Sequence, residues 1–191
     1  MILATSNLHK LGEMRELLGG LDLEPLPEGY ESPVEDGDSF EANALIKARA
    51  AHAATGAAVI ADDSGIESYD LDGAPGIYSA RYAGEGASDE SNLDKLLREV
   101  DALGGERRAA YVCVLALIDA DGTEHVFEAN CAGTLLRERR GDRGFGYDPI
   151  FVPDDTGPDD ERTMSELTPA EKNEISHRGR AARLLAAHLG R

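Results

Sequence analysis

Two adjacent carboxylates, Asp62 and Asp63, follow a short apolar run and precede Ser64 and Gly65. Such a run is typical of a buried strand whose C-terminal end opens into a loop. Ligands gather at strand ends of this kind in α/β proteins. Carboxylates there can hold a hard cation or take a proton from water. The same four residues also suit an ordinary surface turn, so other segments must decide between the two.

The segment between a first predicted strand and a first predicted helix is rich in hydroxyl and amide groups, from Thr5, Ser6 and Asn7. Backbone N–H groups at a helix N-terminus attract phosphate, and Lys10 lies one turn into the helix. The segment has neither the Gly-x-Gly-x-x-Gly nor the Walker A pattern. An ordinary helix cap therefore explains it equally well.

Two charged residues, Lys47 and Glu35, could contribute to a phosphate or metal site. Lys47 falls within a predicted helix, one turn after Asn43, and could reach either phosphate or solvent. Glu35 lies in an acidic loop before that helix, where a carboxylate could supply a second oxygen ligand to a metal or stay solvated. Their spacing alone does not show whether they bind a ligand or remain in solvent.

Phe145, Gly146, Tyr147 and Asp148 place two aromatic rings and a carboxylate in a glycine-rich loop of a chain with only 5% aromatic residues. Aromatic faces stack on nucleic-acid bases for about 1–3 kcal/mol each. An aspartate can also accept hydrogen bonds from ring N–H groups. The alternative is a hydrophobic plug under the loop.

Three donors, Lys172, His177 and Arg178, lie near a predicted helix start. Each alone would be an ordinary surface residue. Together with the preceding segments they describe a nucleotide site. It would have donors for phosphate, carboxylates for Mg²⁺, aromatic rings for a base and donors for a keto oxygen.

Strand and helix patterns run along most of the chain. The predicted strands cover residues 2–5, 24–26, 57–61, 109–119, 124–131 and 150–152. The predicted helices cover residues 7–18, 39–55, 77–82 and 91–100, then one that begins after Thr168 and one from Ser176 to Leu189. We expect the two long strands, joined by a hairpin turn, at the centre of the sheet.

Local signals predict where several helices begin and end. Asp38 and Glu41 have the spacing of a capping box for the second helix, which Gly56 ends. Thr168 and Glu171, with a proline between them, give an N-cap and a capping box for a later helix. The mixed order of elements predicts an α/β or α+β architecture with a mixed sheet.

The composition indicates one folded domain over residues 1–191, with 41% hydrophobic and 29% charged residues. No leader and no long apolar stretch is visible, so we expect a cytoplasmic protein that does not bind membranes. The net charge of −18 argues against a broad nucleic-acid-binding surface. Cys113 and Cys131 are expected to be buried, reduced thiols.

Six segments, in order over almost the whole chain, resemble the inosine triphosphate pyrophosphatase family, also called Ham1 or RdgB-like. They are Ala4–Lys10, Ser39–Asn43, Ala61–Gly65, Gly73–Arg81, Gly144–Pro149 and Ile175–Gly179. The resemblance implies an ITPase-like α/β fold (the Maf/Ham1 fold), with a mixed central sheet, flanking helices and two lobes around one cleft, usually as a homodimer. It also implies a Mg²⁺-dependent pyrophosphohydrolase that converts non-standard purine nucleotides (ITP, dITP, XTP) to the monophosphate and pyrophosphate.

The resemblance carries roles to matching residues. Asp63 matches the general base and, with Glu35, the metal positions. Ser64 matches a substrate contact and Lys47 a phosphate-side lysine. The phosphate-loop matches are Thr5, Ser6, Asn7 and Lys10. The base-binding matches are Phe145, Gly146, Tyr147, Asp148, Lys172, His177 and Arg178, with His177 and Arg178 expected to face O6 of the purine.

Neighbouring side chains alternate along a strand, so Asp62 is expected to hold the loop or support the site while Asp63 faces the metal. Ser6 departs from the glycine common in the family's loop. The acidic run at 153–162 looks longer than usual and is not expected to touch the chemistry. Two alternatives remain: a Maf-like pyrophosphatase of other modified nucleotides, and a non-catalytic nucleotide-binding module that would need no metal carboxylates.

Overall fold

Six strands form one sheet in the order β2-β1-β3-β4-β5-β6. The computed structural model describes residues 1–5 and 7–191. The strands are β1 Ile2–Ala4, β2 Glu24–Pro25, β3 Val59–Ser68, β4 Arg108–Ile118, β5 Glu124–Leu135 and β6 Phe151–Pro153. The helices are α1 Leu8–Leu17, α2 Phe40–Thr55, α3 Asp89–Leu103, α4 Pro169–Ile175 and α5 His177–His188. Short 3₁₀ helices are η1 Tyr69–Leu71, η2 Gly76–Arg81, η3 Asp148–Ile150 and η4 Asp154–Thr156.

The sheet is mixed, as predicted. β1 pairs in parallel with β2 and with β3, whereas β5 pairs antiparallel with β6. The expectation that both long strands lie at the centre is half right, because β3 and β4 are central and β5 is next to the edge. β4 is buried along nearly its whole length, whereas the first half of β5 alternates between exposed and partly buried residues.

The chain divides into two compact units. The first contains Met1–Asp63, Cys113–Ala129 and Arg180–Arg191, and the second contains Ser64–Val112 and Asn130–Gly179. The division falls within β3, β4, β5 and α5, so each of these elements contributes residues to both units. Asp63 and Ser64 are consecutive residues of β3 that belong to different units.

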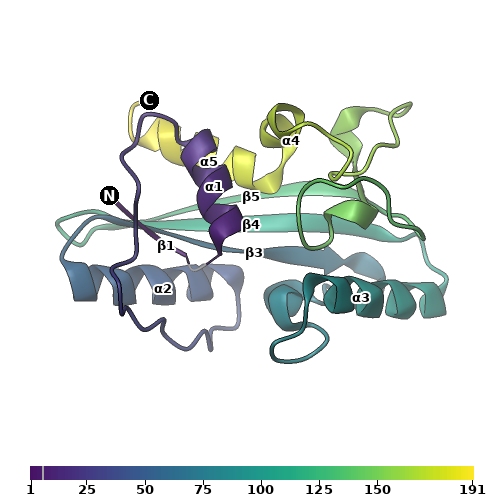
Figure 1. Cartoon of the computed structure of the whole chain (residues 1–191), viewed down its shortest axis with the longest axis horizontal. Helices are drawn as coiled ribbons and strands as arrows, with labels where there is room; N and C mark the ends of the chain where they lie inside the picture. The colour runs from purple at the N-terminus through teal and green to yellow at the C-terminus, as the bar shows by residue number, and fades with distance from the viewer. Residues whose placement is uncertain (6) are drawn as a thin grey trace. The chain divides into compact units, whose positions relative to one another are not determined.

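The first unit has its own apolar core. α1 and α5 lie on one side of its strands and α2 lies on the other (Figure 1). Met14 and Leu18 pack with Ile60 and Leu185 in one cluster of buried side chains. α2 buries small alanines along one face and contacts β1, because small side chains let a helix approach closely.

A second apolar cluster forms the core of the other unit. Leu93, Leu96 and Val100 on one face of α3 pack in a cluster that also holds Tyr111 and Phe151. The rings of Tyr111 and Phe151 lie edge to face, with centroids 4.7 Å apart. This cluster gives the buried polar groups of the unit a rigid apolar surrounding.

Two local predictions are wrong. β3 does not end at Ala61 but continues through the two aspartates to Ser68, because buried lysine and thiol partners let the carboxylates stay in a buried strand. Ser39, and not Asp38, caps α2: its Oγ accepts a hydrogen bond from Ala42 N at 3.1 Å.

Other local predictions are confirmed. Gly56 ends α2 in the left-handed conformation, with φ +64°. Thr168 and Glu171 form the predicted capping box of α4. Cys113 and Cys131 are both buried thiols. In the part of the chain that the structure describes, no helix is both long and apolar enough to cross a membrane.

Candidate active site

Asp62 and Asp63 contact different partners, as strand alternation requires. Asp62 is 1% exposed and accepts hydrogen bonds from Lys10 Nζ and from Cys113 Sγ, the latter at 3.3 Å. Asp63 Oδ1 accepts a hydrogen bond from Lys47 Nζ at 2.6 Å. Asp62 thus holds a lysine of α1, and Asp63 holds a lysine of α2.

Lys47 joins two carboxylates. Its Nζ lies 2.6 Å from Asp63 Oδ1 and 3.0 Å from Glu35 Oε2. α2 positions Lys47, the loop before that helix positions Glu35, and β3 positions Asp63. We call these three residues the carboxylate–lysine cluster. Carboxylates from two separate segments therefore converge on one positive charge.

Burial and charge shift the titration of this cluster in definite directions. Burial raises the pKa of Asp63, although Lys47 and Lys10 oppose the shift. Burial by itself would lower the pKa of Lys47, but Asp63 and Glu35 outweigh it and raise that pKa. Lys47 therefore stays charged at neutral pH, and Asp63 is a stronger base than an exposed aspartate.

The predicted phosphate loop is a well-formed helix cap. Asn7 Oδ1 accepts hydrogen bonds from the backbone N–H groups of His9 and Lys10, at 2.9 and 3.2 Å. Thr5 Oγ1 accepts a hydrogen bond from Asn7 N at 3.2 Å. Ser6, which the sequence also assigned to this loop, lies outside the described residues. The segment thus caps the N-terminus of α1 and places Lys10 within hydrogen-bond distance of Asp62.

A second polar group belongs to the other unit and centres on Asp148, which is 3% exposed. Its carboxylate accepts hydrogen bonds from Tyr111 Oη at 3.1 Å, Phe145 N at 3.0 Å and Lys172 Nζ at 2.8 Å. Burial, with the nearby Asp148 charge, raises the pKa of Tyr111 well above its usual value, so its hydroxyl remains a donor. We call these four residues the Asp148 cluster.

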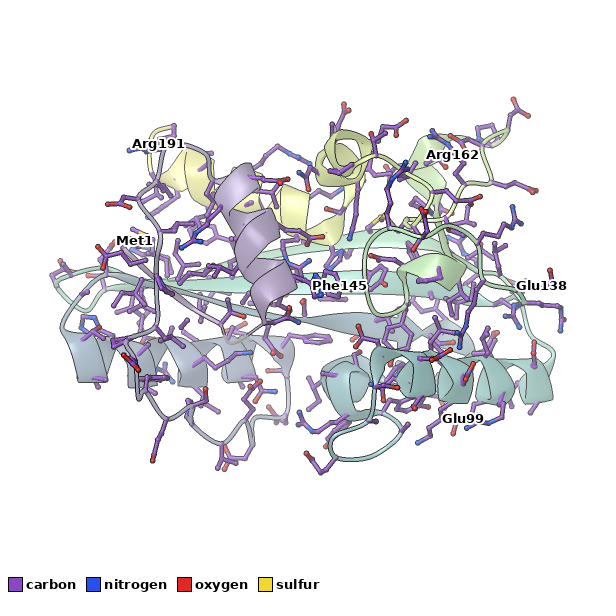
Figure 2. The ribbon with its side chains drawn as sticks, viewed as in Figure 1. Met1, Glu99, Glu138, Phe145, Arg162 and Arg191 are labelled. Atoms are coloured by element: carbon purple, nitrogen blue, oxygen red, sulfur yellow. The ribbon has the colours of Figure 1, made fainter. Side chains whose placement is uncertain are left out.

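Phe145 and Tyr147 have different surroundings despite their similar sequence context. Tyr147 is buried, and its hydroxyl donates to Ser79 O at 2.8 Å. Phe145, labelled in Figure 2, is half-buried, with Lys172 Nζ 5.1 Å and Arg178 Cζ 5.8 Å from its ring centroid. Phe145 is thus the aromatic ring that lies close to two positively charged side chains, whereas Tyr147 is part of the core.

His177 and Arg178 begin α5, where Ser176 Oγ accepts a hydrogen bond from Gly179 N at 3.1 Å. The ring of His177 stacks on that of Tyr111, with centroids 4.6 Å apart and planes 6° from parallel. Arg178 Nη2 donates to Ser64 Oγ at 2.8 Å. The structure therefore brings Ser64, His177 and Arg178 together with the Asp148 cluster in one unit.

Gly144 and Gly146 give the loop its shape, with φ +73° and +62°. Gly146 N donates to Asp89 Oδ2 at 2.9 Å. A Cβ atom on Gly144 would overlap the carboxylate of Asp148, whereas one on Gly146 would meet open space. The first glycine therefore makes room for Asp148, and the second only supplies the backbone conformation.

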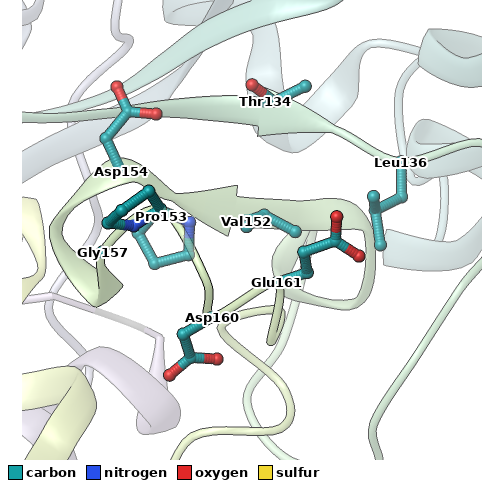
Figure 3. Close-up of a pocket in the computed structure, with 9 residues that line it drawn as sticks. Thr134, Leu136, Val152, Pro153, Asp154, Gly157, Asp160 and Glu161 are labelled. Atoms are coloured by element: carbon teal, nitrogen blue, oxygen red, sulfur yellow. The ribbon is translucent and has the colours of Figure 1, made fainter.

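The pocket in Figure 3 belongs to a different region, with a volume of about 470 Å³. Its lining includes Asp154, Asp160 and Glu161 from the acidic run. Arg108 pairs with Asp154, and Arg162 pairs with Asp160. The lining contains none of the predicted site residues, and its acidic groups disfavour a phosphate anion.

The sequence did not indicate three residues that make polar contacts with predicted site residues or with Asp62. Tyr111 lies within the apolar run of β4, Cys113 follows two residues later, and Ser79 lies in η2. The one available signal was Tyr111 itself, because a tyrosine in a buried strand needs a partner for its hydroxyl.

The comparisons with known proteins agree over nearly the whole chain. Residues 1–188 match the Ham1 family. The chain is 44% identical to a dITP/XTP pyrophosphatase of Corynebacterium diphtheriae, over 97% of this chain and 94% of that protein. It is 47% identical to a protein of the same name from Mycolicibacterium paratuberculosis, over 99% and 95%.

Two solved structures have the same fold. A HAM1 protein from Coxiella burnetii matches with a TM-score of 0.88 and 40% identity, over 99% of this chain and 97% of that one. A nucleoside-triphosphatase, also titled dITP/XTP pyrophosphatase, from Mycobacterium abscessus matches with a TM-score of 0.76 and 44% identity, over 98% and 97%. The mixed sheet, its flanking helices and this likeness along the whole chain make the protein a member of the Ham1 family.

Proposed function

We propose that this chain hydrolyses non-standard purine nucleoside triphosphates, namely ITP, dITP and XTP, to the monophosphate and pyrophosphate. The observation that carries the proposal is the convergence of Glu35 and Asp63 on one cation, in a chain 44% identical to a dITP/XTP pyrophosphatase. A module that only bound nucleotides would have no need of this pair of carboxylates.

Mg²⁺ is the proposed cofactor. The donor set fits it, because Mg²⁺ prefers oxygen ligands and Glu35 and Asp63 offer carboxylate oxygens that already converge on a positive charge. When bound, the ion would supply positive charge to the phosphates of the substrate. Lys47, which holds the same two carboxylates, would then be available to bind a phosphate oxygen.

Asp63 orients a water molecule and takes its proton as that water attacks the α-phosphorus. Burial raises the pKa of this carboxylate, which makes it a better base. Lys10 and Lys47 offset the negative charge that develops on the departing pyrophosphate. Asp62 fixes the ammonium group of Lys10, so the charge is in position before the reaction begins.

The Asp148 cluster is proposed to select the base. The ring of Phe145 offers a stacking face, and Lys172 and Arg178 lie beside it. His177 and Arg178 are the proposed donors to O6 of the purine. Hypoxanthine and xanthine present a keto oxygen at position 6, whereas adenine presents an amino donor and would leave both sides unpaired. Asp148 serves this selection by holding Lys172 and the loop of Phe145 in place.

We also propose that the enzyme works in the cytoplasm and that it is a homodimer, the latter as the family resemblance implies. The alternative of a Maf-like enzyme for other modified nucleotides differs in the base it accepts. Substrate choice therefore separates the two.

A substrate panel tests the proposal. ITP, XTP, dITP, GTP, ATP and dUTP would each be incubated with Mg²⁺ and scored for pyrophosphate and orthophosphate. We expect pyrophosphate from ITP, dITP and XTP and little turnover of ATP. A preference for dUTP would favour the Maf-like alternative. Orthophosphate as the sole product would mean attack at the γ-phosphorus and would overturn the proposal.

A further inference from the structure

We propose that Asp119, His125 and His188 form a second metal site, within the first unit, that takes one transition-metal ion such as Zn²⁺. Asp119 directly follows β4, His125 is the second residue of β5, and His188 is the last residue of α5. None of the three belongs to the residues proposed for pyrophosphate release. An ion bound at this site would join the β4–β5 hairpin to the C-terminal helix.

The ligand atoms already lie close to one another. His125 Nε2 and Asp119 Oδ2 are 3.0 Å apart, and the rings of His125 and His188 have centroids 4.3 Å apart. One ligand atom from each residue lies within 4.8 Å of the other two. Ligand atoms around a tetrahedral zinc ion, bound at about 2.1 Å, lie roughly 3.4 Å apart. A small movement of one side chain would therefore close the site.

His188 is the ligand that can make this movement. It is exposed at the end of α5, whereas Asp119 and His125 are half-buried. Hydrogen bonds of the hairpin turn fix the backbone of Asp119, from Asp119 N to Thr123 O at 2.9 Å and from Gly122 N to Asp119 O at 3.0 Å. The ring of His188 also lies against Phe127, with centroids 5.3 Å apart. Two ligands are thus prearranged, and the third is held nearby.

The donor set selects a different class of ion from the carboxylate–lysine cluster. Two imidazole nitrogens and one carboxylate oxygen suit Zn²⁺, Co²⁺, Ni²⁺ or Cu²⁺, whereas Mg²⁺ prefers oxygen alone. Within residues 1–5 and 7–191 this is the one group of three or more histidine, cysteine or acidic side chains whose ligand atoms come so close. The negative end of the α5 dipole, at His188, also favours a cation.

The test is a calorimetric titration of the metal-free full chain with ZnCl₂, in saturating Mg²⁺ so that oxygen-only sites are occupied. We expect one Zn²⁺ per chain and a higher thermal unfolding midpoint when it is bound. His188→Ala should weaken binding at least about tenfold, because even changes around a metal ligand cost 10–100-fold. His9→Ala, at another exposed histidine on a helix of the same unit, should bind as the parent does.

Two further measurements distinguish loss of the metal site from a general loss of structure. Co²⁺ in place of Zn²⁺ should give visible absorption bands that His188→Ala and Asp119→Asn abolish. Mg²⁺-dependent pyrophosphate release should be unchanged in His188→Ala, since that residue has no part in the reaction. If the parent binds no Zn²⁺ in Mg²⁺, or if His188→Ala and Asp119→Asn bind it equally well, the proposal is wrong.

Discussion

The carboxylate–lysine cluster and the Asp148 cluster use similar residues in opposite ways. In the first, one lysine is shared by two carboxylates; the Glu35 side chain is 34% exposed, whereas those of Lys47 and Asp63 are 14% and 12% exposed. In the second, one carboxylate is shared by several donors, and the Asp148 and Lys172 side chains are only 4% and 10% exposed. The first arrangement can exchange partners with a metal ion and a phosphate, whereas the second is complete without them.

The two clusters should also differ in how much their ion pairs contribute to stability. An ion pair near solvent, such as that of Lys47 with Glu35, contributes only about 0–1 kcal/mol to stability, so its members can change partners at little cost. Removal of one member of a buried pair leaves an unpaired charge and costs about 3–5 kcal/mol. Loss of one carboxylate from the carboxylate–lysine cluster leaves Lys47 with its other partner and should therefore affect activity most, whereas loss of Asp148 should affect the fold.

Of the variants considered, Asp63→Asn should have the largest effect, and it tests whether the carboxylate–lysine cluster serves activity and not the fold. Loss of a general base lowers turnover by about 10²–10⁴-fold, and the fold should persist because Lys47 keeps Glu35 as its partner in this variant. The measurements are pyrophosphate release from ITP and a circular dichroism spectrum. Asp36→Asn, at an exposed aspartate next to Glu35, is the control and should keep full activity. A fully active Asp63→Asn enzyme would remove Asp63 from the reaction.

Asp148→Ala should act on stability instead. It leaves the Lys172 ammonium and the Tyr111 hydroxyl buried without their carboxylate, so the free energy of unfolding should fall by about 3–5 kcal/mol. Urea denaturation measures the change. Asp142→Ala, at an exposed position in the same loop, should change it by less than about 0.5 kcal/mol. Equal stability of the two variants would break the comparison between the clusters.

Gly144→Ala and Gly146→Ala sharpen the comparison within one loop. Both alanines would adopt positive φ, which costs roughly 1–2 kcal/mol. Only the alanine at 144 would also displace the Asp148 carboxylate. We therefore expect Gly144→Ala to lose more stability in urea than Gly146→Ala and to lose selectivity for ITP over ATP. Identical behaviour would show that the contact with Asp148 is unimportant.

Glu35→Gln should have the smallest effect. It removes a negative charge from the proposed metal site, so the Mg²⁺ concentration for half-maximal activity should rise about tenfold, or 1.4 kcal/mol. The unfolding free energy should change by less than about 1 kcal/mol, since Glu35 is partly exposed. Glu31→Gln, at an exposed position of the same loop, is the matched control. An unchanged Mg²⁺ requirement would exclude Glu35 as a ligand.

Features set by neighbours in the sequence could be predicted. The capping box of Thr168 and Glu171 and the left-handed end of α2 at Gly56 depend on a few adjacent residues, and both were predicted. The cap at Ser39 was missed because Asp38, one residue earlier, has equally suitable chemistry. Propensity does not choose between two such neighbours.

Features set by distant contacts could not be predicted. β3 continues through Asp62 and Asp63 because Lys10 and Lys47, far away in the sequence, accompany the carboxylates into the interior. The different surroundings of Phe145 and Tyr147 depend in the same way on partners elsewhere in the chain. The site residues were named from a resemblance, whereas the contacts that position them emerged only from the fold.

Hydrolysis of ITP in water labelled with heavy oxygen tests the central claim most directly. If the carboxylate–lysine cluster directs water to the α-phosphorus, mass spectrometry will find the label in the inosine monophosphate and none in the pyrophosphate. Label in the pyrophosphate would mean attack at the β-phosphorus. That result would contradict the proposed roles of Asp63 and Lys47.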